Sequence, residues 1–209
     1  MIEAARDRHA SFDQYRHPDP ILLRFLDRMQ RGLLGKGIQR NAQLFAATHT
    51  FAFPLTTWAS GVVIPFVYHL LLGGKVELID GARLSFDIVP YGQGEAAYPF
   101  YAAWVLGTRL YFKGDANDWT GVVAVHVDYV PTVEQLTALN AHMTLPRSAA
   151  DAMVESCAAF MAGRAHSDPQ LPAIDEAAFI RRAEKAEEAW LLEVAAMKRT
   201  QTKTIREVW

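Results

Sequence analysis

The chain has 209 residues, of which 51% are hydrophobic and 21% are charged, and its formal net charge is −2. These proportions are typical of a globular protein and exclude a chain that is disordered throughout. The near-neutral charge argues against general nucleic-acid binding, for which a basic domain is expected. The single cysteine, Cys157, cannot form an internal disulfide, and its apolar neighbours indicate a buried thiol.

Charge is distributed unevenly along the chain. Residues 1–45 hold eight Lys or Arg against five Asp or Glu, and residues 46–180 hold six against thirteen. Residues 181–209 hold seven against five, and four of these basic residues lie in the last twelve positions. We therefore expect helical ends, an acidic middle made mostly of strands, and a basic C-terminal arm.

A stretch without Asp, Glu, Lys or Arg runs from Asn41 to Gly74 and is long enough to span a bilayer. Pro54 and Pro65 interrupt it, together with several glycines and threonines, and a lipid-exposed helix tolerates such breakers poorly. Two buried strands joined by a loop explain the same residues, so no membrane association is expected. The charged N-terminus also lacks the apolar core of a signal peptide.

Residues 1–43 predict an N-terminal helical segment. Asp19 suits the N-cap of a helix, and Pro20 suits its first position. An apolar stripe follows at helical spacing, formed by Leu22, Leu26, Met29 and Leu33. A shorter helix is predicted within residues 3–12.

Residues 44–131 predict a β-domain. Asp80-Gly81 and Gly107-Thr108 each separate two β-rich runs, as hairpin turns do. Residues 122–130 alternate like a half-buried strand, with His126 and Asp128 on one face and the following four residues on the other: Val123, Val125, Val127 and Tyr129. Several short strands at this spacing favour an antiparallel β-sandwich or barrel-like block, and the fold class is α+β.

Residues 132–197 predict two or three C-terminal helices. Thr132 with Gln135, and Ser148 with Asp151, have capping-box spacing, so a helix is expected after each, the second buried and ending near Ala162. Asp175 is expected to cap the last helix. An apolar seam along this helix can pack on a helix of the same chain or of a neighbour. It comprises Phe179, Ala183, Ala186, Trp190, Val194 and Met197.

Residues 198–209 predict an extended basic arm, because they are rich in threonine and lack an apolar stripe. A solvated tail and a docking peptide both remain open. The terminal Trp209 favours docking, either by strand addition to a sheet edge or by insertion into a pocket of the partner.

No catalytic or metal centre is evident, so neither an enzyme nor a cofactor is expected. The seven histidines have no metal-ligand spacing. The acidic loop at residues 115–121 fails as a calcium loop because Trp119 takes a position that needs an oxygen ligand, and we interpret it as a β-turn loop. One alternative is a small-molecule-binding or enzymatic sandwich, in which His126 and Asp128 line a pocket with Trp104 and Trp119.

The layout of the chain resembles the head–tail adaptor (connector or neck) proteins of tailed bacteriophages. The similarity lies in the pattern of residue types along three parts of the chain. These are residues 84–132, the later stretch LPRSAADAMVESCAAFMAGR, and the charged helix with its basic tail. It covers most of the chain.

The resemblance implies a structural virion protein at the neck, assembled in the host cytoplasm, that joins the portal to the next tail component. It implies a homo-oligomer, a twelve-fold ring, with DNA passing through its channel without specific binding; an acidic ring suits such a conduit. Carried over by position, the portal-docking residues are Lys198, Arg199, Lys203, Arg206 and Trp209. The nearest alternative is a tail-completion, tail-tube or baseplate protein.

Overall fold

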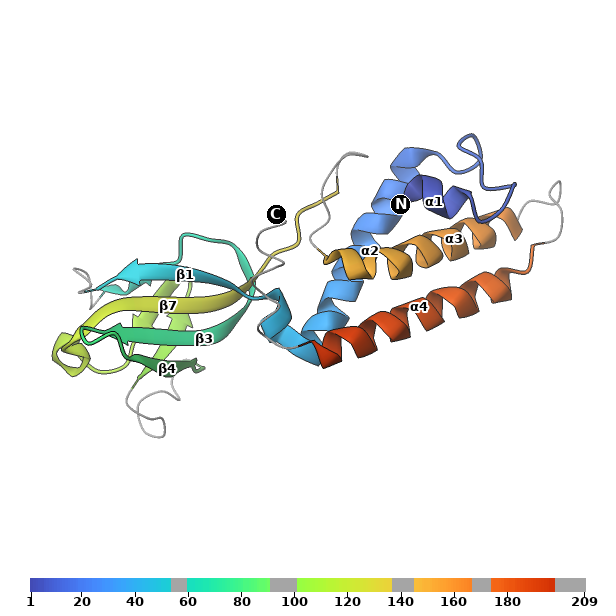
Figure 1. The fold of residues 1–209 in the computed structure, drawn as a ribbon. Helices are drawn as coiled ribbons and strands as arrows, with labels where there is room; N and C mark the ends of the chain where they lie inside the picture. The colour runs from blue at the N-terminus through green and yellow to red at the C-terminus, as the bar shows by residue number, and fades with distance from the viewer. Residues whose placement is uncertain (54–59, 91–100, 137–144, 167–173, 198–209) are drawn as a thin grey trace. The chain divides into compact units, whose positions relative to one another are not determined.

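The computed structural model describes residues 1–53, 60–90, 101–136, 145–166 and 174–197. The protein is α+β, and its chain forms two compact units (Figure 1). The helical unit combines residues 1–44 with the part of the chain that follows Thr132, and the β unit comprises residues 45–132. The helical unit is therefore discontinuous in sequence, with the whole β unit inserted between its two segments.

Four α-helices and a 3₁₀ turn build the helical unit. They are α1 (Ile2–Arg6), α2 (Asp19–Asn41), η4 (Arg147–Ala149), α3 (Ala150–His166) and α4 (Glu176–Ala196). Most side chains of α3 that face its neighbours are fully buried, including Met153, Cys157 and Met161, and α3 packs against α1, α2 and α4. The prediction of a buried helix in this segment is confirmed, although the helix extends four residues beyond Ala162.

The start of α2 differs from its prediction. Pro18 occupies the N-cap with an extended backbone, and Asp19 is the first helical residue without capping the helix through its side chain. The Asp19 carboxylate instead accepts a hydrogen bond from Arg6 at 2.5 Å. The predicted stripe is largely correct, since Leu22, Leu26 and Leu33 are buried.

The capping box at Thr132 is also wrong within the described residues, because positions 132–136 form no helix. Side chains of α2 bind the backbone of this segment instead. Gln30 Nε2 donates to the carbonyl of Glu134 at 2.9 Å, and Asp27 Oδ1 accepts from the amide of Leu136 at 3.0 Å. Ser148 likewise caps no helix, since it lies inside η4, which begins after Pro146 without a side-chain cap.

Asp175 caps α4 as predicted. Its carboxylate accepts a hydrogen bond from the amide of Ala178 at 3.0 Å, which satisfies one of the free N–H groups of the first turn.

The β unit contains one seven-stranded sheet within the described residues, in the order β1-β7-β3-β4-β5-β6-β2. The strands are β1 (Ala47–Ala52), β2 (Val62–Val63), β3 (Tyr68–Leu78), β4 (Arg83–Ile88), β5 (Ala102–Leu106), β6 (Arg109–Phe112) and β7 (Val122–Pro131). Both predicted hairpins are present, β3–β4 around Gly81 and β5–β6 around Gly107, with both glycines at positive φ. The sheet is mixed, because β4 and β5 pair in parallel, and the prediction of a wholly antiparallel block is wrong for this pair.

The sheet curls around one apolar core. Val76, Val125 and Leu110 are almost completely buried there, and Trp119 is fully buried between them and the loop that carries it. Trp119 ends a short 3₁₀ helix, η3 (Ala116–Trp119), which Asp115 caps through a capping box. The interpretation of this segment as a β-turn loop is therefore wrong: the loop is a capped turn that places a core residue.

Strand β7 carries an irregularity that changes its faces. Its pairing with β3 passes from Glu77↔Ala124 directly to Leu78↔Val122, so Val123 has no partner on β3. Such a bulge reverses the alternation of side chains beyond it. Val125 and Val127 lie in the core as predicted, whereas Val123 is 40% exposed, against the prediction.

Candidate functional site

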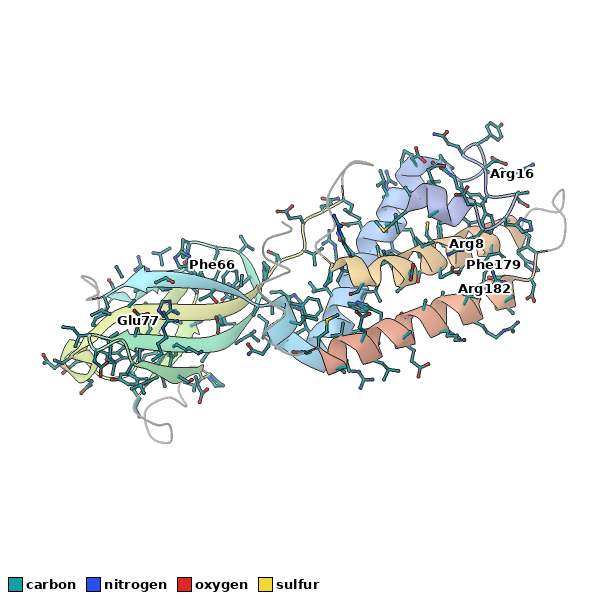
Figure 2. All side chains as sticks on the ribbon, in the orientation of Figure 1. Arg8, Arg16, Phe66, Glu77, Phe179 and Arg182 are labelled. Carbon is teal, nitrogen blue, oxygen red and sulfur yellow. The ribbon has the colours of Figure 1, made fainter. Side chains whose placement is uncertain are left out.

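The apolar seam of α4 lies in the core of the helical unit. Phe179, Trp190 and Val194 are buried, while the smaller Ala183 and Ala186 are half-buried. The seam packs against α2 and α3, and near its start Arg182 lies over the Phe179 ring, 5.6 Å from its centroid (Figure 2). These side chains are thus occupied within their own chain, and a role between protomers must rest on other faces of the helix.

The C-terminal end of α4 is held by one side chain of α2. Asn41 Nδ2 donates to the carbonyl of Val194 at 3.1 Å and to that of Met197 at 2.9 Å. The last carbonyls of a helix lack intrahelical partners, so these bonds satisfy groups that would otherwise need water. Met197 then leaves the helix with an extended backbone, at φ −67° and ψ 132°. The chain therefore departs toward residue 198 from a fixed point.

The five predicted portal-docking residues, Lys198, Arg199, Lys203, Arg206 and Trp209, lie outside the described residues. Their docking role stays a prediction.

A groove runs along α2 and α4 beside this end. Lys36 and Arg40 of α2 line one side, and six residues of α4 line the other: Glu184, Glu187, Glu188, Leu191, Leu192 and Ala195. Lys36 forms an ion pair with Glu187. Leu192 is 66% exposed and lies on the face of α4 opposite its buried seam.

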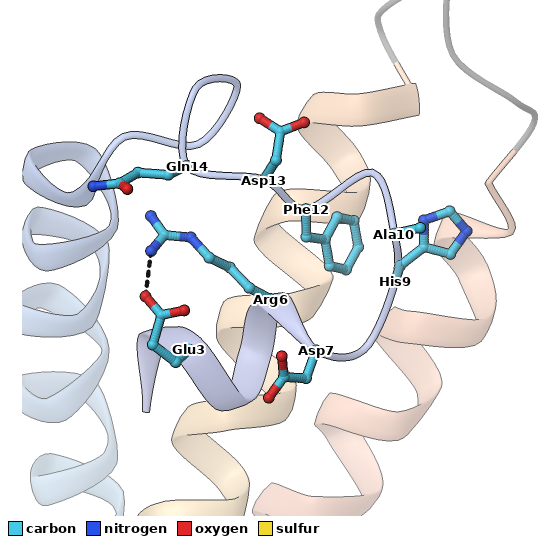
Figure 3. Close-up of a pocket in the computed structure, with 8 residues that line it drawn as sticks. All are labelled: Glu3, Arg6, Asp7, His9, Ala10, Phe12, Asp13 and Gln14. Carbon is cyan, nitrogen blue, oxygen red and sulfur yellow. Dashed lines mark hydrogen bonds and ion pairs between the residues drawn. The ribbon is translucent and has the colours of Figure 1, made fainter.

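A second depression lies at the N-terminus and is lined by residues of α1 and the loop that follows it, most of them polar, together with Ala10 and Phe12 (Figure 3). Figure 3 shows the carboxylates of Asp7 and Asp13 pointing in different directions rather than toward one another. Asp13 accepts hydrogen bonds from the backbone and side chain of Arg16, and the backbone bond is the main reason why the pKa of Asp13 is lowered. Asp7 and Asp13 thus do not form a facing pair of carboxylates of the kind that acid–base catalysis can use, and Glu3, the third acidic residue of the lining, is paired with Arg6.

Arg6 is the buried centre of this region. Its guanidinium donates to Glu3 Oε1 at 2.7 Å, to Asp19 Oδ1 at 2.5 Å and to the carbonyl of His17 at 2.8 Å. These contacts join α1, the loop and the first turn of α2. Arg6 is therefore a structural clamp for the N-terminal segment.

His17 is buried beside the same loop and is only 2% exposed. Its ring stands edge-on to Phe12, with centroids 5.7 Å apart, and neither ring nitrogen has a hydrogen-bond partner in the described part of the chain. Burial is the main cause that lowers the pKa of His17, followed by the positive charge of Arg164. The carboxylate of Asp13 opposes this shift, and Arg6 and Arg16 add smaller effects that lower the pKa. The folded protein therefore holds this imidazole in its neutral form.

The free energy of unfolding should consequently decrease as the pH falls from 7.5 to 5. Below about 6.5 the unfolded chain binds a proton at His17 that the folded chain resists, so acid favours the unfolded state. Urea unfolding across this pH range should show a shallower slope for His17→Gln than for the wild type. An unchanged slope in the variant would show that other groups cause the acid sensitivity.

A polar row crosses the outer face of the β unit. His126 on β7 contacts Thr50 Oγ1 through Nδ1 at 2.9 Å and Glu77 Oε2 through Nε2 at 3.0 Å, and Glu77 also pairs with Arg83 of β4 at 2.8 Å (Figure 2). The hydrogen bond from His126, followed by that from Arg83, lowers the pKa of Glu77. These are cross-strand pairs on a solvated sheet face, of the kind that stabilise a sheet locally.

The residues named for a small-molecule pocket do not converge. Asp128 accepts a hydrogen bond from Thr48 Oγ1 at 2.5 Å, in the same polar row as His126. Trp119 lies in the core, and Trp104 stacks on Tyr111 of β6. Trp104 is on β5, three strands away from β7, which corresponds to roughly 14 Å. The pocket of that alternative is therefore not formed by these four side chains.

Among the described residues there is neither a metal cluster nor a membrane-spanning helix. No cluster of three or more His, Cys, Asp or Glu residues that could hold a metal ion occurs among them. Within the same residues, no helix combines the length and the apolarity needed to cross a bilayer.

Burial raises the pKa of the Cys157 thiol to about 11, so this cysteine is held in its unreactive protonated form.

Comparison with known proteins gave no assignment: the sequence matches no protein-family model and none of the curated proteins.

Sequence reasoning missed the polar residues that tie the helical unit together. Arg6, Gln30 and Asn41 each bind groups far away in the chain, up to 156 residues for Asn41 and Met197. Only Gln30 left a trace in the sequence, because it lies between Leu26 and Leu33 on a face that is otherwise apolar. A polar residue at such a position indicates a buried hydrogen bond.

Proposed function

We propose that this chain is a structural virion protein, a head-to-tail adaptor that joins the portal to the tail as a twelve-membered ring around the DNA channel. The proposal starts from the resemblance of the sequence to phage adaptors. The division into a helical unit and a β unit supports it, and the curled sheet corresponds to the barrel-like block of that layout. In this role the β unit contacts the next tail component, and DNA passes without specific binding.

The observation that carries the proposal is the fixed origin of the arm. Asn41 ties the carbonyls of Val194 and Met197 to α2, so the residue that precedes the arm is held in place. The twelve residues that follow hold four basic side chains, one acidic side chain and a terminal tryptophan. Arginine and tryptophan are the residue types that most often carry binding energy at interfaces. An anchored base limits the volume that a short peptide explores, which lowers the entropic cost of docking.

Binding to the portal ring of the phage that encodes this chain tests the proposal. We expect the full chain to bind and the chain ending at Met197 to bind at least about a hundredfold more weakly, because it lacks the aromatic anchor and four positive charges. A variant with Lys198, Arg199, Lys203 and Arg206 replaced by glutamine and Trp209 retained separates the effect of charge from that of the anchor.

The shortened chain must keep the circular dichroism spectrum and thermal transition of the full chain for this comparison to hold. Equal binding of the two forms to the portal would reject the docking arm. Failure of both to bind the portal, with binding to a purified tail component instead, would favour the tail-completion alternative.

A further inference from the structure

The outward face of α2 carries a stripe that its own unit does not use. Arg24, Arg28, Gly32 and Gly35 follow one another at spacings of four, four and three residues, on the side of the helix opposite the buried stripe. No ion pair is recorded for Arg24 or Arg28 within the part of the chain that the structure describes. The neighbouring Arg31 differs, since it pairs with Asp27 at 2.8 Å.

The two glycines of this stripe have no packing role in their own unit. A Cβ placed on Gly32 or Gly35 meets no atom within 4 Å. Glycine is among the poorest residues for a helix interior, so its presence at Gly32, which is exposed, and at Gly35, which is half-buried, needs a reason. For Gly37 the reason is its burial within the unit. For Gly32 and Gly35, glycine would allow the close approach of another backbone.

The outward face of α4 carries a complementary stripe at the same spacing. Glu184, Glu188, Leu192 and Ala195 again follow one another at four, four and three residues, and all four line the groove beside α2. Lys36 pairs with Glu187 and not with Glu184 or Glu188, for which the described residues provide no ion pair. The stripe therefore offers two carboxylates followed by an apolar surface.

We propose, on the basis of the ring assembly proposed above, that α2 of one copy packs along the α4 groove of the next copy. In this arrangement Arg24 pairs with Glu184 and Arg28 with Glu188. Gly32 and Gly35 then lie against Leu192 and Ala195, where the missing side chains let the two helices approach closely. One register satisfies all four contacts because the spacings on the two helices are identical.

The direction of the helices agrees with a ring. Lys36 contacts Glu187 and, five residues later, Asn41 contacts Val194, so α2 and α4 run the same way within a chain. Rotation about a ring axis preserves the sense of helices that run along it, so α2 and the next copy's α4 are also parallel. The contact uses two different faces of each copy, as a cyclic assembly requires, whereas a two-fold dimer uses the same face twice.

Charge reversal tests this contact. We compare Arg24→Glu/Arg28→Glu, which reverses the α2 stripe, with Glu184→Arg/Glu188→Arg, which reverses the α4 stripe. Native mass spectrometry, with and without the portal, should show the ring for the wild type and its loss for each variant alone. An equimolar mixture of the two variants should recover the ring, because each reversed stripe then meets a reversed partner.

Arg147→Glu/Arg164→Glu is the matched control. Both arginines are exposed and belong to the helical unit outside the two stripes. Their replacement changes the net charge by the same amount as Arg24→Glu/Arg28→Glu does. This control should retain the ring. Gly35→Leu provides a test free of charge effects: the helix should not lose thermal stability, since the position is open, whereas self-association should weaken by about tenfold or more.

The outcomes separate the contact from the function. A wild-type ring that persists in both charge-reversal variants overturns the α2–α4 contact and leaves the adaptor proposal standing. Loss of the ring in each variant without recovery in the mixture also overturns this pairing. A wild type that stays monomeric both alone and with the portal overturns the adaptor proposal together with the contact.

Discussion

Replacement of Trp119 by alanine should lower the free energy of unfolding of the β unit by about 3–5 kcal/mol. The side chain is fully buried, and its ring packs against those of Phe53, Tyr101 and Phe112. Its Nε1 also donates to the carbonyl of Lys113 at 2.9 Å, which ties the end of β6 to the loop. The substitution therefore leaves a large cavity and removes a buried hydrogen bond in the same place.

Trp104→Ala is the matched control, because Trp104 lies on the outer face of the same sheet and stacks mainly on Tyr111. Its loss should cost about 1–2 kcal/mol, the value of an aromatic pair with partial burial. Differential scanning calorimetry can record the two variants beside the wild type, with the transition of the helical unit as an internal reference. Equal destabilisation by the two substitutions would show that Trp119 is not the centre of the core.

The elements that local sequence predicted correctly are those whose determinants lie within a few residues. The β3–β4 and β5–β6 hairpins follow from Gly81 and Gly107, which adopt the positive φ that a tight turn needs. The cap of α4 follows from Asp175 in the same way. In each case the side chain or backbone that decides the structure belongs to the turn itself.

The elements that were predicted wrongly depend on partners distant in sequence. Thr132 and Gln135 have the spacing of a capping box, yet Asp27 and Gln30 of α2 bind the backbone there, and positions 132–136 form no helix. The parallel pairing of β4 with β5 is a tertiary arrangement that no turn residue specifies. The sequence pattern places Trp119 either as an obstacle to calcium binding or in the wall of a pocket, and neither interpretation predicts its burial in the core. A large aromatic residue among acidic ones is itself a reason to expect an anchored loop.

For the candidate site, periodicity predicted which face of α4 is apolar but not what covers it. The structure buries Phe179, Trp190 and Val194 within the helical unit. The role of the opposite face could not be predicted, because positive and negative charges are mixed along the helix. Only the fold shows that Glu184 and Glu188 line one groove with Leu192. A surface that serves an assembly is hard to predict from sequence, since its partner atoms belong to another molecule.

Replacement of Arg6 by methionine should destabilise the helical unit by about 2–4 kcal/mol. Methionine keeps much of the apolar stem, so the change removes mainly the guanidinium and its bonds to Asp19 and to the carbonyl of His17. The loss of one partner from a buried ion pair costs about 3–5 kcal/mol, and the partial exposure of Asp19 reduces this figure. Chemical unfolding monitored by the helical signal of circular dichroism measures the effect.

Glu3→Gln separates the buried part of this network from its exposed part. Glu3 bonds to the same guanidinium, but its side chain is 81% exposed, so its replacement should cost less than about 1 kcal/mol. In Arg6→Met/Asp19→Asn the two costs should not add, because the second change removes a carboxylate that the first has already left without its partner. Strict additivity of the two substitutions would mean that the Arg6–Asp19 ion pair does not hold α1 to α2, and that Arg6 acts through its other contacts.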